Sequence, residues 1–277
     1  MSIETNEELQ ALQAIGRIVG RTLREMAGQV RPGITTAELD AIGAKLLAAE
    51  GAQSAPPIVY GFPGAVCICI NDEIVHGIPG ARRVAPGDLV KLDLTAQKDG
   101  YMADAALTVA VPPASYAALR LAACAELAFA RATREARARR RISDIGAAVE
   151  REVRRSGFSV VRELCGHGIG RTIHEEPQVP NYWDPRLSLR LTEGLVITVE
   201  PILAAGRGDA FLASDGWTMK TADHSLAAHF EHTLVSPATH PSSSPPPEPL
   251  LILLSRMTRC SCRFSRPSSQ RRRGERR

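Results

Sequence analysis

Residues 88–111 carry the clearest alternation of apolar and polar positions in the chain. Apolar residues at every second position from Val90 alternate with polar ones, and a second alternating run follows the Asp-Gly pair at 99–100. Alternation with a period of two predicts β-strands, and Asp-Gly favours a tight turn with positive φ, so a hairpin is expected here. With an even number of loop residues, Asp93 and Asp104 fall on the same face, opposite or diagonal to each other.

Two carboxylates that face each other repel unless one is protonated or a cation bridges them. The hairpin alone leaves two interpretations open. Asp93 and Asp104 are either two solvated acids on an exposed face or one half of a metal site.

Helical periodicity of apolar residues predicts four helices, and Thr5 with Glu8 and Thr35 with Glu38 form capping boxes before the first two. The helices are expected at about residues 6–30, 35–50, 113–141 and 143–156. Short strands are expected at residues 58–60, 65–71, 159–164, 194–201, 209–212, 217–221 and 229–235. On its own, the segment 174–177 is expected to be a polar loop.

Helix–helix–strand order occurs twice, which suggests two related halves at about 6–111 and 113–235 of a catalytic domain spanning 1–255. The segment 236–249 is rich in Pro and Ser and is predicted to be a linker, followed by a last strand at 250–254. Residues 256–277 are predicted to form a disordered basic tail.

Composition is that of a globular protein, because 44% of the 277 residues are hydrophobic and the mean hydropathy is near zero. The N-terminus is acidic and lacks the apolar stretch of a secretory signal, and six cysteines are too few for a disulfide scaffold. Reduced thiols and a cytoplasmic location are therefore expected. The net charge of +4 divides into +8 for residues 256–277, with nine Arg and one Glu, and 4 − 8 = −4 for the rest.

The second half supplies further candidate ligands. His167 lies among three glycines at 166, 168 and 170, and Glu200 and Glu231 each interrupt an apolar strand. Carboxylates in such strands are rarely buried without a partner, although a single one is more often paired or at an edge. Together with the two aspartates of the hairpin, this set suits two divalent cations such as Mn, Fe(II), Co or Zn. That is hydrolase chemistry, with His76 and His174 as uncharged helpers.

The ordered motifs closely resemble those of type I methionine aminopeptidases over roughly residues 5–235. They are Gly61-Phe62-Pro63, Val75-His76-Gly77-Ile78-Pro79, Asp93, Asp104, Gly166-His167-Gly168-Ile169-Gly170, His174-Glu175-Glu176-Pro177, Glu200-Pro201 and Glu231-His232-Thr233. The resemblance implies an α/β (α+β) pita-bread fold, in which two pseudo-symmetric halves share a central, mostly antiparallel sheet covered by helices. A dinuclear metal centre would lie between the halves.

By the same resemblance, the metal ligands are Asp93, Asp104, His167, Glu200 and Glu231, with Asp104 and Glu231 bridging the two cations. His174 would contact the scissile carbonyl, His76 would orient the substrate or assist the leaving group, and Glu200 would shuttle a proton from the attacking water. The pocket for the methionine side chain matches Phe62, Cys67 and Trp217, with Tyr60 and Ile173 adjoining. For Cys67 and Trp217, packing in the core is an equally good interpretation.

The implied activity is removal of the N-terminal methionine from nascent proteins and peptides with a small second residue. A free α-amine that ligates one metal would restrict cleavage to the first residue. The resemblance further implies a cytoplasmic monomer that meets its substrates near the ribosome exit, with no membrane partner.

Four departures from the family pattern bear on these expectations. Ala105 replaces a Thr or Ser, so a hydroxyl that supports Asp104 is expected to be missing. Tyr60 and Val59 replace His and Tyr, and His229 replaces Gln on the face of Glu231. With all five ligands and both helper histidines present, activity is expected, with an altered preference for the first side chain.

Three other hypotheses are weighed against this one. Proline-specific relatives of the fold carry an extra N-terminal domain, for which there is no room before residue 61, and type II enzymes carry an insertion for which the second half has little space. The third is a non-catalytic pita-bread protein that binds RNA or ribosomes through the basic tail. That tail could also add a weak RNA contact to an active enzyme.

Overall fold

The computed structural model describes residues 1–237 and 250–251. Four long helices and one short helix form in this part of the chain. Their bounds are α1 Asn6–Gln29, α2 Thr36–Ala49, α3 Ala55–Tyr60, α4 Tyr116–Ala132 and α5 Ile142–Arg155. Thr35 and Glu38 form the predicted capping box. The predicted box of Thr5 and Glu8 forms only in part: the Thr5 hydroxyl accepts from the Glu8 N–H, but the Glu8 carboxylate accepts from the N–H of Glu4.

The central sheet has the strand order β1-β4-β5-β14-β9-β7-β8, with β2 added to β4 and β15 added to β14. Its strands are β1 Gln53–Ser54, β2 Cys67–Ile70, β4 Leu89–Lys98, β5 Tyr101–Ala110, β7 Cys165–Gly168, β8 Glu175–Pro180, β9 Val196–Val199, β14 Glu231–Val235 and β15 Leu250–Leu251. Two small sheets complete the described fold. One joins β13 (Ala227–His229), β10 (Ile202–Ala204) and β6 (Ser159–Val160), and the other joins β11 (Ala210–Leu212), β12 (Met219–Thr221) and β3 (Glu73–Val75).

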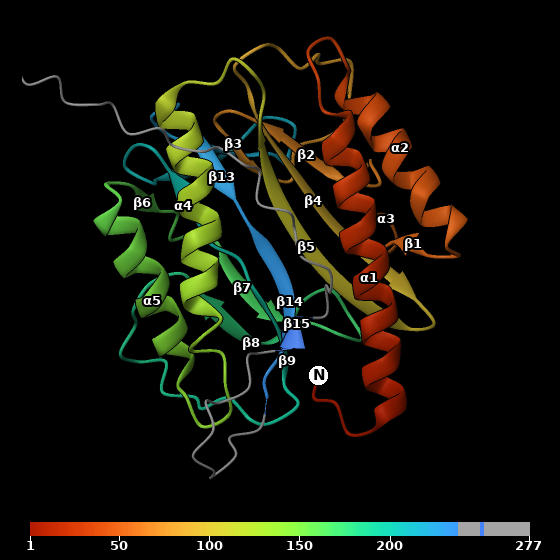
Figure 1. The fold of residues 1–277 in the computed structure, drawn as a ribbon, viewed down its shortest axis with the longest axis vertical. Coiled ribbons are helices and arrows are strands. Elements are labelled where there is room, and N and C mark those ends of the chain that lie inside the picture. The colour runs from red at the N-terminus through yellow and green to blue at the C-terminus, as the bar shows by residue number, and fades with distance from the viewer. Residues whose placement is uncertain (238–249, 252–277) are drawn as a thin grey trace, which may run out of the picture.

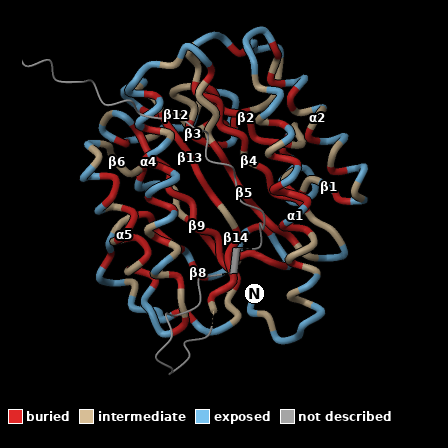
Figure 2. The backbone as a smooth tube through the Cα atoms, in the orientation of Figure 1, coloured by how far each residue is buried: buried red, intermediate tan, exposed pale blue. Residues whose placement is uncertain are grey.

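The long helices lie on one side of the central sheet, with α1 and α2 over the first half and α4 and α5 over the second (Figure 1). The main core lies between these helices and the sheet, and one cluster of buried residues there includes Leu23, Leu92, Ala105, Leu121 and Val149. Figure 2 shows buried residues along the central strands and exposed residues on the outer helix faces. The other face of the sheet is therefore free to present polar side chains.

The predicted hairpin is confirmed. Strands β4 and β5 pair in antiparallel fashion, and the two loop residues Asp99 and Gly100 have φ of 52° and 77°. These left-handed conformations match the tight turn that Asp-Gly favours. Thr95 lies directly opposite Asp104, so Asp93 and Asp104 are diagonal neighbours on one face.

The interpretation of that face as exposed to solvent is wrong. Asp104 is 5% exposed, and Lys91 on the same face of β4 is 1% exposed. The Lys91 ammonium donates to the carbonyls of Asn71 at 2.8 Å and Ala227 at 3.2 Å. Loss of hydration lowers the pKa of Lys91 to about 8.

We expect Lys91→Met to change the pH dependence of stability. The folded-state pKa of Lys91 is below the ordinary value, so between about pH 8 and 10 the unfolded chain binds the proton that the folded chain has released. The parent should therefore gain stability relative to the Met variant, by about 2–3 kcal/mol from pH 7 to 10. Urea unfolding of both proteins at each pH measures the difference. A difference that does not change with pH would contradict the buried charge.

Several predicted elements differ from the observed ones. The segment 58–60 is not a strand, because Pro56 and Pro57 start helix α3, which ends at Gly61 with φ of 71°. The third helix ends at Ala132 and turns follow to Arg141. The segment 174–177 is not only a loop, since β8 begins at Glu175 and pairs with β7.

The C-terminal predictions are addressed only in small part. Residues 250–251 pair with β14, in agreement with the predicted last strand, while 252–254, most of the linker 236–249 and the tail 256–277 lie outside the described residues. Among the residues that the structure describes, no helix combines the length and apolar character that a membrane span requires.

Candidate metal-dependent active site

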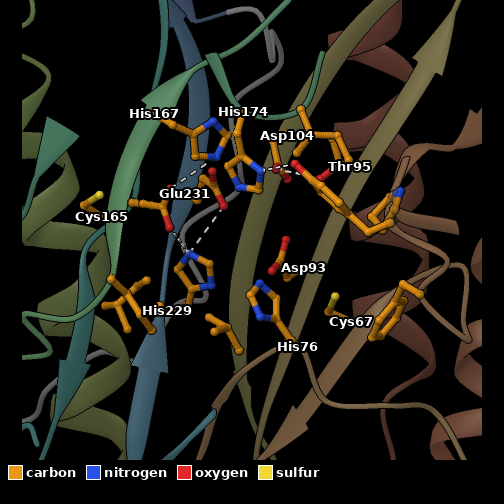
Figure 3. Close-up of a pocket in the computed structure, with 18 of the residues that line it drawn as sticks. Cys67, His76, Asp93, Thr95, Asp104, Cys165, His167, His174, His229 and Glu231 are labelled. Carbon is orange, nitrogen blue, oxygen red and sulfur yellow. Dashed lines mark hydrogen bonds and ion pairs between the residues drawn. The ribbon is translucent and has the colours of Figure 1, made fainter. Parts of the chain in front are cut away.

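A single cavity on the face of the sheet away from the long helices collects every predicted site residue (Figure 3). These residues are Tyr60, Phe62, Cys67, His76, Asp93, Asp104, His167, His174, Glu200, Trp217 and Glu231. Ile173, expected beside the pocket, lines it too. The structure thus brings together residues that lie between Tyr60 and Glu231 in the chain.

Pairing between the two halves explains this convergence. Asp93 and Asp104 come from β4 and β5, whereas His167 and Glu231 come from β7 and β14, and Glu200 directly follows β9. Strand β14 pairs with β5, which places Glu231 opposite Ala106. Carboxylates of both halves therefore face each other across the middle of one sheet.

Two of the three glycines around His167 are required by the neighbouring strands. A Cβ atom at residue 168 would lie 2.2 Å from the carbonyl oxygen of Glu176, and one at residue 166 would lie 2.6 Å from that of Thr198. Both contacts are too short for any side chain. Strands β8 and β9 can therefore pack tightly on either side of β7, which fixes the position of His167.

The carboxyl groups of the cavity shift one another's protonation. Burial raises the pKa of Asp93, Glu200 and Glu231 well above the ordinary range, and the negative charge of Asp104 raises each of them further. Burial also raises the pKa of Asp104, although the hydroxyl of Thr95 opposes that shift. Such a cluster stays charged at neutral pH only if cations balance it.

Asp104 is held more firmly than the sequence suggested. The Thr95 hydroxyl donates to its Oδ2 at 2.6 Å, and the Thr233 hydroxyl exchanges hydrogen bonds with its backbone N–H and carbonyl. Ala105 lies on the opposite face of β5, within the main core. Position 105 therefore supplies no hydroxyl, as expected, but Asp104 is supported by the hydroxyl of Thr95. Its position directly opposite Asp104 in the predicted hairpin was the signal that could have identified it.

Three imidazoles surround the carboxylates, and burial lowers the pKa of His76, His167 and His174. His167 Nδ1 lies 2.9 Å from the Gly168 carbonyl, to which it donates as N–H. This arrangement leaves the lone pair of Nε2 free, 3.6 Å from Glu200 Oε1. His76 has a positive φ of 58°, a conformation that non-glycine residues adopt mostly at special sites.

Tyr60 and His174 form a pair at the mouth of the cavity. The Tyr60 hydroxyl lies 2.5 Å from His174 Nδ1. Burial raises the pKa of Tyr60, so the phenol keeps its proton, and its O–H donates a hydrogen bond to Nδ1. The ring proton of His174 is then on Nε2.

An apolar wall borders the polar cluster. The rings of Phe62 and Trp217 meet edge to face at 5.3 Å, and Cys67 pairs with Asp93 across β2 and β4. Burial raises the pKa of the Cys67 thiol well above its ordinary value, so the thiol stays protonated and apolar in character.

The donor groups fit divalent cations. Asp104, His167 and Glu231 can direct ligand atoms to one point, and so can Glu200, His229 and Glu231. Asp104 Oδ1 and Glu231 Oε1 are buried without a hydrogen-bond partner among the described residues. Carboxylate oxygens with one or two imidazole nitrogens suit Mn, Fe(II), Co or Zn. The buried oxygens would therefore be satisfied by metal ions.

Comparison with known proteins agrees with this geometry. The model of metallopeptidase family M24 matches residues 10–236. Methionine aminopeptidase 2 of Bacillus subtilis is 40% identical over 237 residues, which cover 85% of this chain and 95% of that protein. Methionine aminopeptidase of Clostridium perfringens is 38% identical over 232 residues, or 84% and 93% of the two chains.

Solved structures are similar in fold. The methionine aminopeptidase of Rickettsia prowazekii superposes with a TM-score of 0.85 at 32% identity, covering 92% of this chain and all of that one. The prolidase of Pyrococcus furiosus covers 92% of this chain and 66% of its own, with a TM-score of 0.72 at 20% identity, which shows a shared fold alone. The predicted pita-bread architecture is confirmed. The chain therefore belongs to metallopeptidase family M24 and, within it, to the methionine aminopeptidases.

Proposed function

We propose that this protein removes the N-terminal methionine from peptides and nascent proteins whose second residue is small. The observation that carries the proposal is the convergence of four carboxylates and the Nε2 of His167 beside an apolar wall in one cavity. Asp93, Asp104, His167, Glu200 and Glu231 would hold two divalent cations, of Co, Mn, Fe(II) or Zn. When bound, these cations would polarise the scissile carbonyl and lower the pKa of a water molecule.

The remaining steps belong to side chains of the chain itself. Glu200 accepts a proton from the attacking water and passes it to the leaving amine. The Thr198 hydroxyl, which donates to its Oε1 at 3.0 Å, orients this carboxylate. The Nε2–H of His174 donates a hydrogen bond to the carbonyl oxygen as negative charge develops there. His76, which lines the cavity, orients the peptide and assists the leaving amine. Phe62, Cys67 and Trp217 enclose the methionine side chain.

Hydrolysis of Met-Ala-Ser tests the proposal. We expect cleavage of this peptide with added Mn, Co, Fe(II) or Zn, and none of N-acetyl-Met-Ala-Ser, because the acetyl group removes the free amine that would bind a cation. Turnover of an Ala-Pro dipeptide in place of Met-Ala-Ser would indicate the specificity of a prolidase instead. Cleavage of the acetylated peptide at an equal rate would contradict the role of the amine.

Tyr60→Phe should lower kcat about threefold to tenfold and change KM little. The variant keeps the aromatic ring but loses the hydrogen bond that orients His174, and such a bond contributes about 0.5–1.5 kcal/mol. Steady-state kinetics on Met-Ala-Ser measure both constants. Tyr116→Phe, which alters an exposed tyrosine on α4, is the matched control. An unchanged kcat would show that the phenol does not position His174.

The expected site of action, location and oligomeric state remain predictions. A site of action near the ribosome exit, a cytoplasmic location and a monomeric state are compatible with the proposed substrate. The comparisons lend no support to RNA binding as an alternative function, and a contact through residues 256–277 lies outside the described residues.

A further inference from the structure

His229 is a buried imidazole that the proposed mechanism does not use. It ends strand β13, is 1% exposed and lies two residues before Glu231. Its backbone is fixed by Thr108, whose hydroxyl accepts from the His229 N–H at 3.0 Å and donates to its carbonyl at 2.8 Å. The ring projects into the cavity beside Glu231 (Figure 3).

Neither ring nitrogen of His229 has a hydrogen-bond partner among the described residues. A buried polar atom without a partner costs about 1–3 kcal/mol, so such atoms are rare in folded proteins. Here two of them belong to one side chain whose backbone is firmly held. This arrangement indicates a partner that binds in the cavity.

The surroundings of Nε2 identify the class of that partner. Nε2 lies 3.3 Å from Glu231 Oε2 and 3.8 Å from Glu200 Oε2. Ligand atoms that share one cation each lie about 2.0–2.2 Å from it, so their mutual separations fall at about 3–4 Å. Both distances fit this range.

A simple hydrogen bond explains the arrangement less well. A bond from an imidazole N–H to a carboxylate is shortest and strongest near about 2.7–2.9 Å, and the contact with Glu231 is longer and forms no hydrogen bond. Glu200 meanwhile faces one imidazole on each oxygen, because His167 Nε2 lies 3.6 Å from its Oε1. The two histidines therefore flank the same carboxylate from opposite sides.

We propose that His229 is an additional nitrogen ligand of the divalent-cation site and binds the cation held by Glu200 and Glu231. This inference rests on the metal centre of the proposed function. It gives the centre two imidazoles in place of one. Imidazole favours Zn, Co, Ni and Fe over Mn, so His229 shifts the selectivity of this site towards those metals.

Proton NMR of the protein loaded with two equivalents of Co(II) tests the proposal without a change in sequence. Each coordinated imidazole contributes one strongly shifted, exchangeable N–H resonance. We expect two such resonances in the parent, from His167 and His229, and one in His229→Gln. A single resonance in the parent would overturn the proposal, while failure to bind Co(II) at all would contradict the proposed function itself.

Titration calorimetry adds a second measurement. His229→Gln should lower the affinity for Zn about 10- to 100-fold and the affinity for Mn by less. His232→Gln is the matched control, because His232 lies on β14 next to Glu231 but packs against Phe129 and Phe230 on the other face. Equal losses for Zn and Mn in the His229 variant, or equal effects of the two variants on Zn, would contradict ligation by His229.

Discussion

Asp104→Asn should lower kcat/KM on Met-Ala-Ser by about 10³-fold, which corresponds to about 4 kcal/mol of lost transition-state stabilisation. The substitution keeps the size of the side chain but removes the negative charge. Oδ1 of Asp104 is buried without a hydrogen-bond partner among the described residues, and a carboxylate oxygen of Asp104 lies close to ligand atoms of His167 and Glu231. A neutral amide offers one weaker oxygen donor in place of a carboxylate that can bridge two cations.

In Asp104→Asn, the metal content of the protein after gel filtration should fall together with its activity. A graded control is Thr95→Val, which removes the hydroxyl that donates to Asp104 Oδ2 but leaves the carboxylate in place. We expect about a 10- to 100-fold loss of metal affinity for that variant, as is typical when a group that supports a ligand is removed. Normal turnover by Asp104→Asn would rule out the proposed metal ligands, and an Asn variant milder than Thr95→Val would reverse the assigned roles.

Divalent cations should stabilise the protein more as the pH rises. In the cation-free protein the carboxyl groups of Asp93, Glu200 and Glu231 have raised pKa values. Each therefore contributes stability that is fully present below the unfolded pKa, near 4, and is lost as the pH rises through the folded pKa. Cations bind the deprotonated groups and relieve the repulsion that develops, so protons and cations compete.

The difference in free energy of unfolding between cation-loaded and chelated protein measures this effect. It should be close to zero at pH 4.5 and reach about 2.7 kcal/mol for each bound cation at pH 7.5, when the cation is present at 100 times the Kd of its site. In chelated protein, Glu231→Gln should remove one titrating group. The variant should therefore become more stable relative to the parent as the pH rises. A cation effect that stays constant over this range would show that the buried carboxylates are not its ligands.

Local sequence determined the parts of this protein whose geometry depends on near neighbours. Asp-Gly at 99–100 and the alternation beside it were sufficient to place Asp93 and Asp104 on one face, because a two-residue turn sets the register of both strands. Thr35 with Glu38 marked a helix start for the same reason. The ordered motifs added the family and the identity of the candidate ligands, all of which lie in one cavity.

Tertiary structure decided what depends on distant segments. The burial of the polar hairpin face follows from long-range packing: Lys91 reaches the carbonyl of Ala227, 136 residues away. Strand β8 forms because β7 pairs with it, although 174–177 has the composition of a loop. The orientation of His229 towards Glu200 and Glu231 likewise arises only when β13 and β14 take their places. Periodicity along a chain specifies which face a side chain occupies, whereas the partner on that face is specified only by packing between segments.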